Sequence, residues 1–125
     1  MATTADIKDE ALRERLGAAE RLLDADQFRA AVERCAETYL LILRQHPALA
    51  QQARELSAAG LAPPGGGRPA IGGPTPVWPI GVGLCIAFDG DGAPHTTLEK
   101  ERFSFSEAAT CFEFVLDLAT RAERP

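Results

Sequence analysis

Apolar residues recur at helical spacing along most of the chain, with one long interruption rich in glycine and proline. The first stripe is Leu12, Leu16, Ala19 and Leu23. It predicts a helix over about residues 6–23. Further apolar stripes predict helices over about residues 27–45 and 48–59, and Pro47 separates the two because proline cannot continue a helix. The interruption, residues 61–81, predicts a loop.

After the loop the pattern changes to one typical of strands. Residues 82–88, VGLCIAF, are apolar, and the following DGDG is a turn sequence. The alternation in HTTLEKERF completes a predicted β-hairpin over residues 82–103. Ser104 and Glu107 form a capping-box pattern at the start of a last helix over 105–122. We therefore predict a single domain, residues 1–125, of mainly α (α+β) class: a bundle of about four helices with a β-hairpin inserted before the last helix.

Two predicted helices are apolar over more than one face. TYLLIL ends the second helix, and CFEFVLDL lies in the last one. A helix that is apolar on most sides is buried in a bundle or meets a partner. We therefore expect a small non-enzymatic protein that acts by association, as an accessory or adaptor subunit or as a homo-oligomer. The expected interface residues are Tyr39, Leu40, Leu43, Phe112, Phe114 and Leu118.

Composition and charge limit the kinds of partner and compartment that we expect. The net charge of −5 gives no basic surface for nucleic acid, and the apolar runs are too short to span a membrane. The N-terminus has no apolar signal-peptide region. Three widely spaced cysteines do not form a disulfide framework and suit a reducing cytoplasm. We expect a cytoplasmic protein, and the richness in Ala, Arg, Gly and Pro suits a GC-rich bacterial genome.

The loop over residues 61–81 has two dissimilar halves. Its glycine half, GGGRPAIGG, lacks the residues of a phosphate-binding motif and is typical of a tether. Its second half contains the one tryptophan, Trp78, which we expect to fold back onto the bundle. The alternative is a ligand-binding protein or minor enzyme with a pocket under this loop, using Trp78, His95 and Cys85.

The sequence gives no metal-binding pattern. Asp89 and Asp91 resemble the start of a calcium loop, but Pro94 and Lys100 stand where such a loop requires Gly and Glu. The cysteines and the two histidines have none of the close spacings of zinc sites. We expect neither a metal nor a cofactor.

The segment LLDADQFRAAVERCAETY resembles the helical hairpin of tetratricopeptide repeats, in which a turn precedes an aromatic residue and then an alanine, here Phe28 and Ala31. The long second helix is also similar to HEPN-type helical domains. This resemblance, over residues 11–47, implies a toxin–antitoxin or defence component as a further alternative. The HEPN nuclease motif places a His several residues after an Arg. Only Gln45 separates Arg44 from His46, so the resemblance assigns no catalytic residue.

Overall fold

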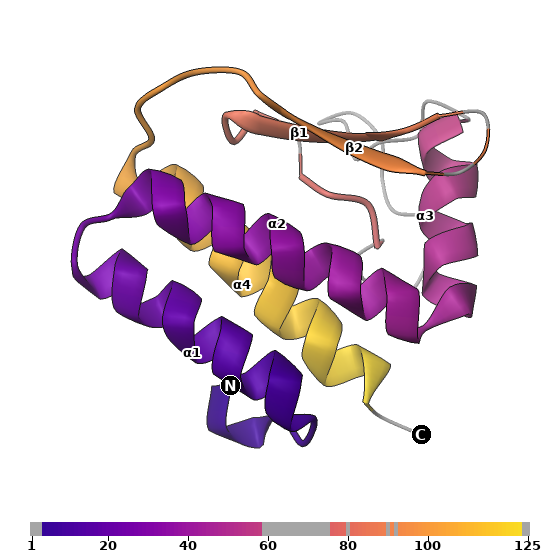
Figure 1. The fold of residues 1–125 in the computed structure, drawn as a ribbon, viewed down its shortest axis with the longest axis horizontal. Helices are drawn as coiled ribbons and strands as arrows, with labels where there is room; N and C mark the ends of the chain where they lie inside the picture. Colours follow the sequence, from indigo (N-terminus) through magenta and orange to yellow (C-terminus); the bar gives the residue numbers. More distant parts are fainter. Residues whose placement is uncertain (1–3, 59–75, 80, 90, 92, 124–125) are drawn as a thin grey trace.

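The computed structural model describes residues 4–58, 76–79, 81–89, 91 and 93–123 (Figure 1). Their elements are a 3-10 turn (Thr4–Asp6), α1 (Glu10–Asp24), α2 (Phe28–Gln45), α3 (Pro47–Ala58), β1 (Leu84–Phe88), β2 (Pro94–Leu98) and α4 (Phe105–Ala122). The predicted mainly helical α+β fold, with a hairpin before the last helix, is confirmed. Most of the predicted 61–81 loop, including its glycine half, lies outside the described residues.

Capping decides where the helices begin. The Asp9 carboxylate accepts a hydrogen bond from the Leu12 amide at 3.0 Å, which satisfies a donor that has no partner within the helix. α1 therefore starts at Glu10, later than the apolar pattern predicts. Pro47 occupies the first position of α3, where its missing N–H removes no helical hydrogen bond. The prediction that this proline separates two helices is confirmed.

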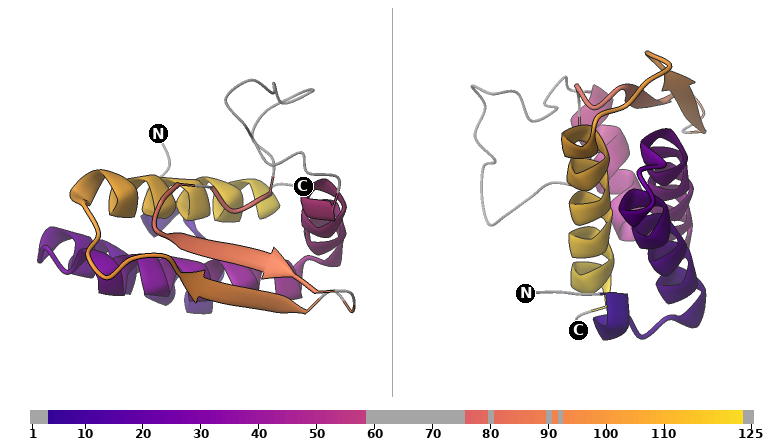
Figure 2. Two further views of the ribbon diagram at one scale, coloured as in Figure 1. Left: turned by 90° about the horizontal axis from the view of Figure 1, so that it is seen from above. Right: turned by 90° about the vertical axis from the view of Figure 1, so that its left-hand side faces the viewer.

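Three helices form the body of the molecule. α1, α2 and α4 lie side by side, α3 stands crosswise at one end of α2, and the hairpin lies on the side of the bundle away from α1 (Figures 1 and 2). α2 contacts both α1 and α4 extensively. The largest side chains of the core that are fully buried include Ile7, Leu12, Leu16, Val32, Tyr39, Ile42 and Val115. Burying each large aliphatic side chain contributes about 1.5–3 kcal/mol.

One carboxylate ties the C-terminal end of α4 to the N-terminal end of α1. Glu123, directly after α4, accepts hydrogen bonds from the backbone amides of Lys8 at 2.7 Å and Asp9 at 2.8 Å. These amides precede the first turn of α1, where a negative charge is favourable. The contact fixes α4 against the beginning of the chain.

The hairpin is antiparallel, with Leu84 opposite Leu98 and Phe88 opposite Pro94. At its tip one oxygen of Asp89 accepts hydrogen bonds from the amides of Asp91 and Ala93, each at 2.9 Å. An aspartate that binds its own turn in this way accounts for Asp89 at the start of the DGDG sequence. The hairpin that the sequence predicts between the loop and the last helix is confirmed.

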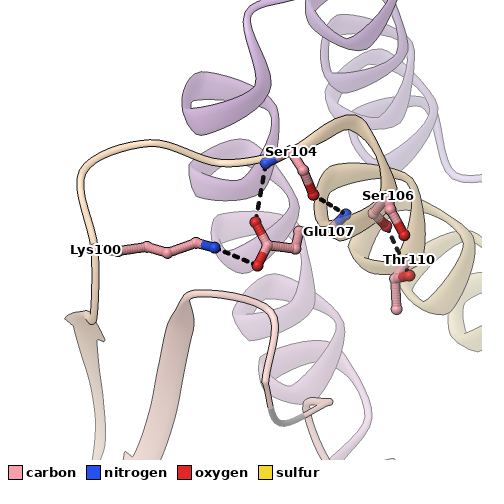
Figure 3. Close-up of polar contacts among 5 residues, drawn as sticks. All are labelled: Lys100, Ser104, Ser106, Glu107 and Thr110. Atoms are coloured by element: carbon pink, nitrogen blue, oxygen red, sulfur yellow. Dashed lines mark hydrogen bonds and ion pairs between the residues drawn. The ribbon is translucent and has the colours of Figure 1, made fainter.

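The capping box predicted at the start of α4 is present (Figure 3). The Ser104 hydroxyl accepts from the Glu107 amide at 3.1 Å, and the Glu107 carboxylate accepts from the Ser104 amide at 2.9 Å. The other carboxylate oxygen binds the Lys100 ammonium. Glu107 thereby connects the end of the hairpin segment to the first turn of α4. The Lys100 hydrogen bond is the main reason that the pKa of Glu107 lies below its ordinary value.

We expect this contact to make stability fall in acid. The pKa of Glu107 is lower in the folded protein than in the unfolded chain, so its contribution is complete above the ordinary value of 4.5 and is lost as the pH falls through the folded value. Urea unfolding measured between pH 7 and pH 3 checks this, with Glu107→Gln giving a shallower acid loss than the wild type.

A double variant supplies the control for this prediction. Lys100→Met removes the main cause of the pKa shift, so it also makes the acid loss shallower, and adding it to Glu107→Gln changes the slope little further. An acid loss in Glu107→Gln as steep as in the wild type contradicts the assignment.

Candidate functional site

Trp78 is docked on the bundle, as the sequence predicts. Its side chain is buried, and its ring centroid lies 5.4 Å from that of Tyr39 and 5.9 Å from that of Phe114. The indole N–H donates to the Leu84 carbonyl at 2.9 Å. The Tyr39 hydroxyl donates to the Pro76 carbonyl at 2.6 Å. Residues 76–79 therefore join the hairpin to α2 and α4 through aromatic packing and two buried hydrogen bonds.

Most of the residues expected to form an interface are buried in the core of the chain itself. Tyr39, Leu43, Phe112 and Leu118 are buried. Leu40 and Phe114 are half-buried and pack against the core. The physical reason is that α2 is covered from several directions, by α1, α4 and α3 and by the aromatic packing of residues 76–79. The four buried side chains leave little surface for a partner in this fold, while Leu40 and Phe114 keep part of theirs.

Trp78, His95 and Cys85 do not meet in one site. Trp78 is buried against Tyr39 and Phe114, whereas Cys85 and His95 are exposed on the hairpin. Their positions in the register place both of these on the face opposite Leu84, since side chains alternate along a strand. The pocket predicted under the 61–81 loop depends mostly on residues 61–75, which lie outside the described part of the chain.

The polar groups at the hairpin tip hold the turn. His95 Nε2 lies 3.1 Å from a carboxylate oxygen of Asp89, and this contact is the main reason that the pKa of Asp89 is lowered. The other oxygen binds the two turn amides described above. Across the residues that the structure describes, no three His, Cys, Asp or Glu side chains gather in a way that could hold a metal ion.

The two cysteines of the core are poorly suited to thiol chemistry. Cys35 and Cys111 are buried on facing helices α2 and α4. Burial raises the pKa of Cys111 to about 12 and that of Cys35 further still, because a thiolate loses its hydration in an apolar interior. Since the thiolate is the reactive form, both behave as small apolar side chains at neutral pH.

The hairpin leaves an open edge along β2. The Asp89 amide donates to the Ala93 carbonyl, and the Glu99 amide donates to the Gly83 carbonyl. Hydrogen-bonded and non-hydrogen-bonded pairs alternate in an antiparallel ladder, so the hydrogen-bonded pairs between these two contacts are Cys85 with Thr97 and Ala87 with His95. The alternate residues of β2, Thr96 and Leu98, therefore direct their N–H and C=O groups away from β1. In the described part of the chain nothing pairs with these groups.

All five residues of β2 are exposed. Leu98, with 37 % of its surface exposed, is one of two large apolar side chains in the described residues that are classed as exposed; Phe105, at 58 %, is the other. Sequence reasoning singled out only His95 on β2, as a possible ligand contact, and gave the strand edge no role. The available signal was the number of predicted strands, because a sheet of two strands always has two edges whose backbone groups lack a strand partner.

The comparisons with known proteins give no relative. No protein-family model matches the chain, and no curated protein and no solved structure matches it. Within the residues described, every helix is too short or too polar to cross a bilayer.

Proposed function

We propose that this protein is non-enzymatic and acts by association, as an accessory or adaptor subunit or as a homo-oligomer, through the outer edge of its hairpin. The observation that supports this is β2: five exposed residues whose outward backbone groups have no partner among the described residues. An exposed strand edge is a template for another strand, and edge pairing is a common mode of protein recognition. We therefore place the proposed interface on the β2 edge, whereas the sequence pattern favoured the apolar helix faces.

The chemistry of β2 supports association. It contains no Asp, Glu, Lys or Arg, so lysine, a frequent protection of natural edges, is absent from it. Pro94 removes one donor, at the first position only. A sheet of only two strands is also marginally stable by itself, so a further strand would add stabilising hydrogen bonds to it.

Light scattering coupled to size-exclusion chromatography, together with affinity capture from the native cell, tests the proposal. We expect either a mass above 13.4 kDa or a reproducible partner that is lost when β2 is altered. A strict monomer that captures no protein contradicts it.

A further inference from the structure

We propose that the partner of β2 is β2 of a second copy of this chain, paired antiparallel about a two-fold axis to give a four-stranded sheet. The inference rests on the proposed function and names its partner. Figure 2 shows β2 as the outer strand of the hairpin, with β1 on its side toward α4 and with α2 beneath the hairpin. Among the described residues no further strand lies beyond this outer edge, so its backbone groups are open to a second hairpin.

The backbone of β2 is complementary to itself. Residues with outward N–H and C=O groups alternate along the strand, and full antiparallel overlap of Pro94–Leu98 with its copy places Thr96 on the two-fold axis. There each Thr96 donates to and accepts from Thr96 of the second copy, as in an ordinary hydrogen-bonded pair. Each Leu98 amide then reaches the Pro94 carbonyl of the second copy.

The position of Pro94 fits this register. Proline lacks an N–H, so it is tolerated in a sheet where it leaves few hydrogen bonds unmade. In the full-overlap register it lies at the outer end of the new pairing, opposite Leu98, and only the carbonyl of Leu98 stays without a donor. In the alternative register, with Pro94 on the two-fold axis, the central pair has no N–H donor. The register centred on Thr96 uses every outward N–H of the two strands.

The side chains of β2 also accept this pairing. On the face that carries Leu84 and Ile86, the half-exposed Leu98 meets the Pro94 ring of the second copy, which removes apolar surface from water. On the other face Thr97 meets His95. No pair of like charges lies directly opposite within the five residues, which would otherwise be destabilising. A two-fold interface of this kind uses the same residues on both copies.

Thr96→Pro is the sharpest test. The Thr96 amide points away from β1, so proline there removes the hydrogen bond to the second copy and keeps those within the hairpin. We expect the wild type to approach twice 13.4 kDa across a roughly hundredfold rise in concentration. Losing both amide donors on the axis weakens the dimer by roughly 10- to 100-fold.

Two lysine substitutions, one on the proposed interface and one away from it, control for effects on folding. Leu98→Lys places a charge on the new interface, while Ala87→Lys places the same charge on exposed β1, away from the outer edge. We expect Leu98→Lys to dissociate the dimer and Ala87→Lys to leave it intact, with circular dichroism unchanged in both. The measurements use physiological salt, because a net charge of −5 on each copy opposes association at low salt.

The outcomes separate this inference from the proposed function. A dimer that survives Thr96→Pro and Leu98→Lys overturns the inference and leaves association through another surface. A monomeric wild type that captures a partner through β2 also overturns it, while the proposed function stands. A monomer that captures nothing overturns both. Dissociation by the two edge variants, with Ala87→Lys still dimeric, supports the inference.

Discussion

Replacing Trp78 with alanine is expected to lower the free energy of unfolding by about 3–5 kcal/mol. Only 3 % of its surface is exposed, and its ring packs against Tyr39 and Phe114. The substitution leaves a cavity between the hairpin and the bundle and removes the donor to the Leu84 carbonyl. Because whole domains are stable by about 5–15 kcal/mol, such a loss is a large part of the total. Urea unfolding followed by circular dichroism measures it.

Two conservative variants divide this effect into its parts. Trp78→Phe keeps an aromatic ring but loses the N–H, and Tyr39→Phe loses only the hydroxyl that binds the Pro76 carbonyl. Each leaves one buried carbonyl without its donor, at a cost of about 1–3 kcal/mol. We expect both to be milder than Trp78→Ala. A loss below about 1 kcal/mol for Trp78→Ala contradicts the view that residues 76–79 hold the hairpin on the helices.

The fold was predictable because its local signals agree with one another. The apolar spacing along α1, α2 and α4 matches the faces that pack together, and Ser104 with Glu107 marked the start of α4. The start of α1 was placed too early, because the apolar pattern alone does not show that Asp9 acts as the cap. Periodicity locates a helix, and a single side-chain hydrogen bond then sets its end.

The site was predicted less well, for a physical reason. Apolar excess on a helix shows that a side chain will be buried but not by which element, and for Tyr39 the answer is Trp78 of the same chain. The open edge of β2 depends on which backbone groups face outward. That is fixed by the hairpin register, in which Thr96 lies opposite Ile86, and a one-residue slip would reverse it.

Gly83→Ala is expected to destabilise the protein by about 2–5 kcal/mol. Gly83 has a φ of +90°, which disfavours any residue with a Cβ by about 1–2 kcal/mol. An added Cβ would also lie 2.5 Å from Cε2 of the buried Phe103 ring. Relieving such a clash costs a further 1–3 kcal/mol or so. Urea unfolding gives the total, and Trp78 fluorescence reports whether the neighbouring docked segment loosens.

Gly81→Ala is the matched control, because Gly81 has a similar φ of +78°, but no atom of the described residues beyond its chain neighbours lies within 4 Å of an added Cβ. It should cost only the backbone strain, about 1–2 kcal/mol. The difference between the two variants therefore measures the contact with Phe103. Phe103→Leu in the Gly83→Ala background should recover part of that difference, since a smaller side chain makes room for the methyl group, and a double-mutant cycle quantifies the coupling. If both glycine variants lose the same free energy of unfolding, the added methyl group at position 83 is accommodated without cost, and Gly83 is not tightly packed against Phe103.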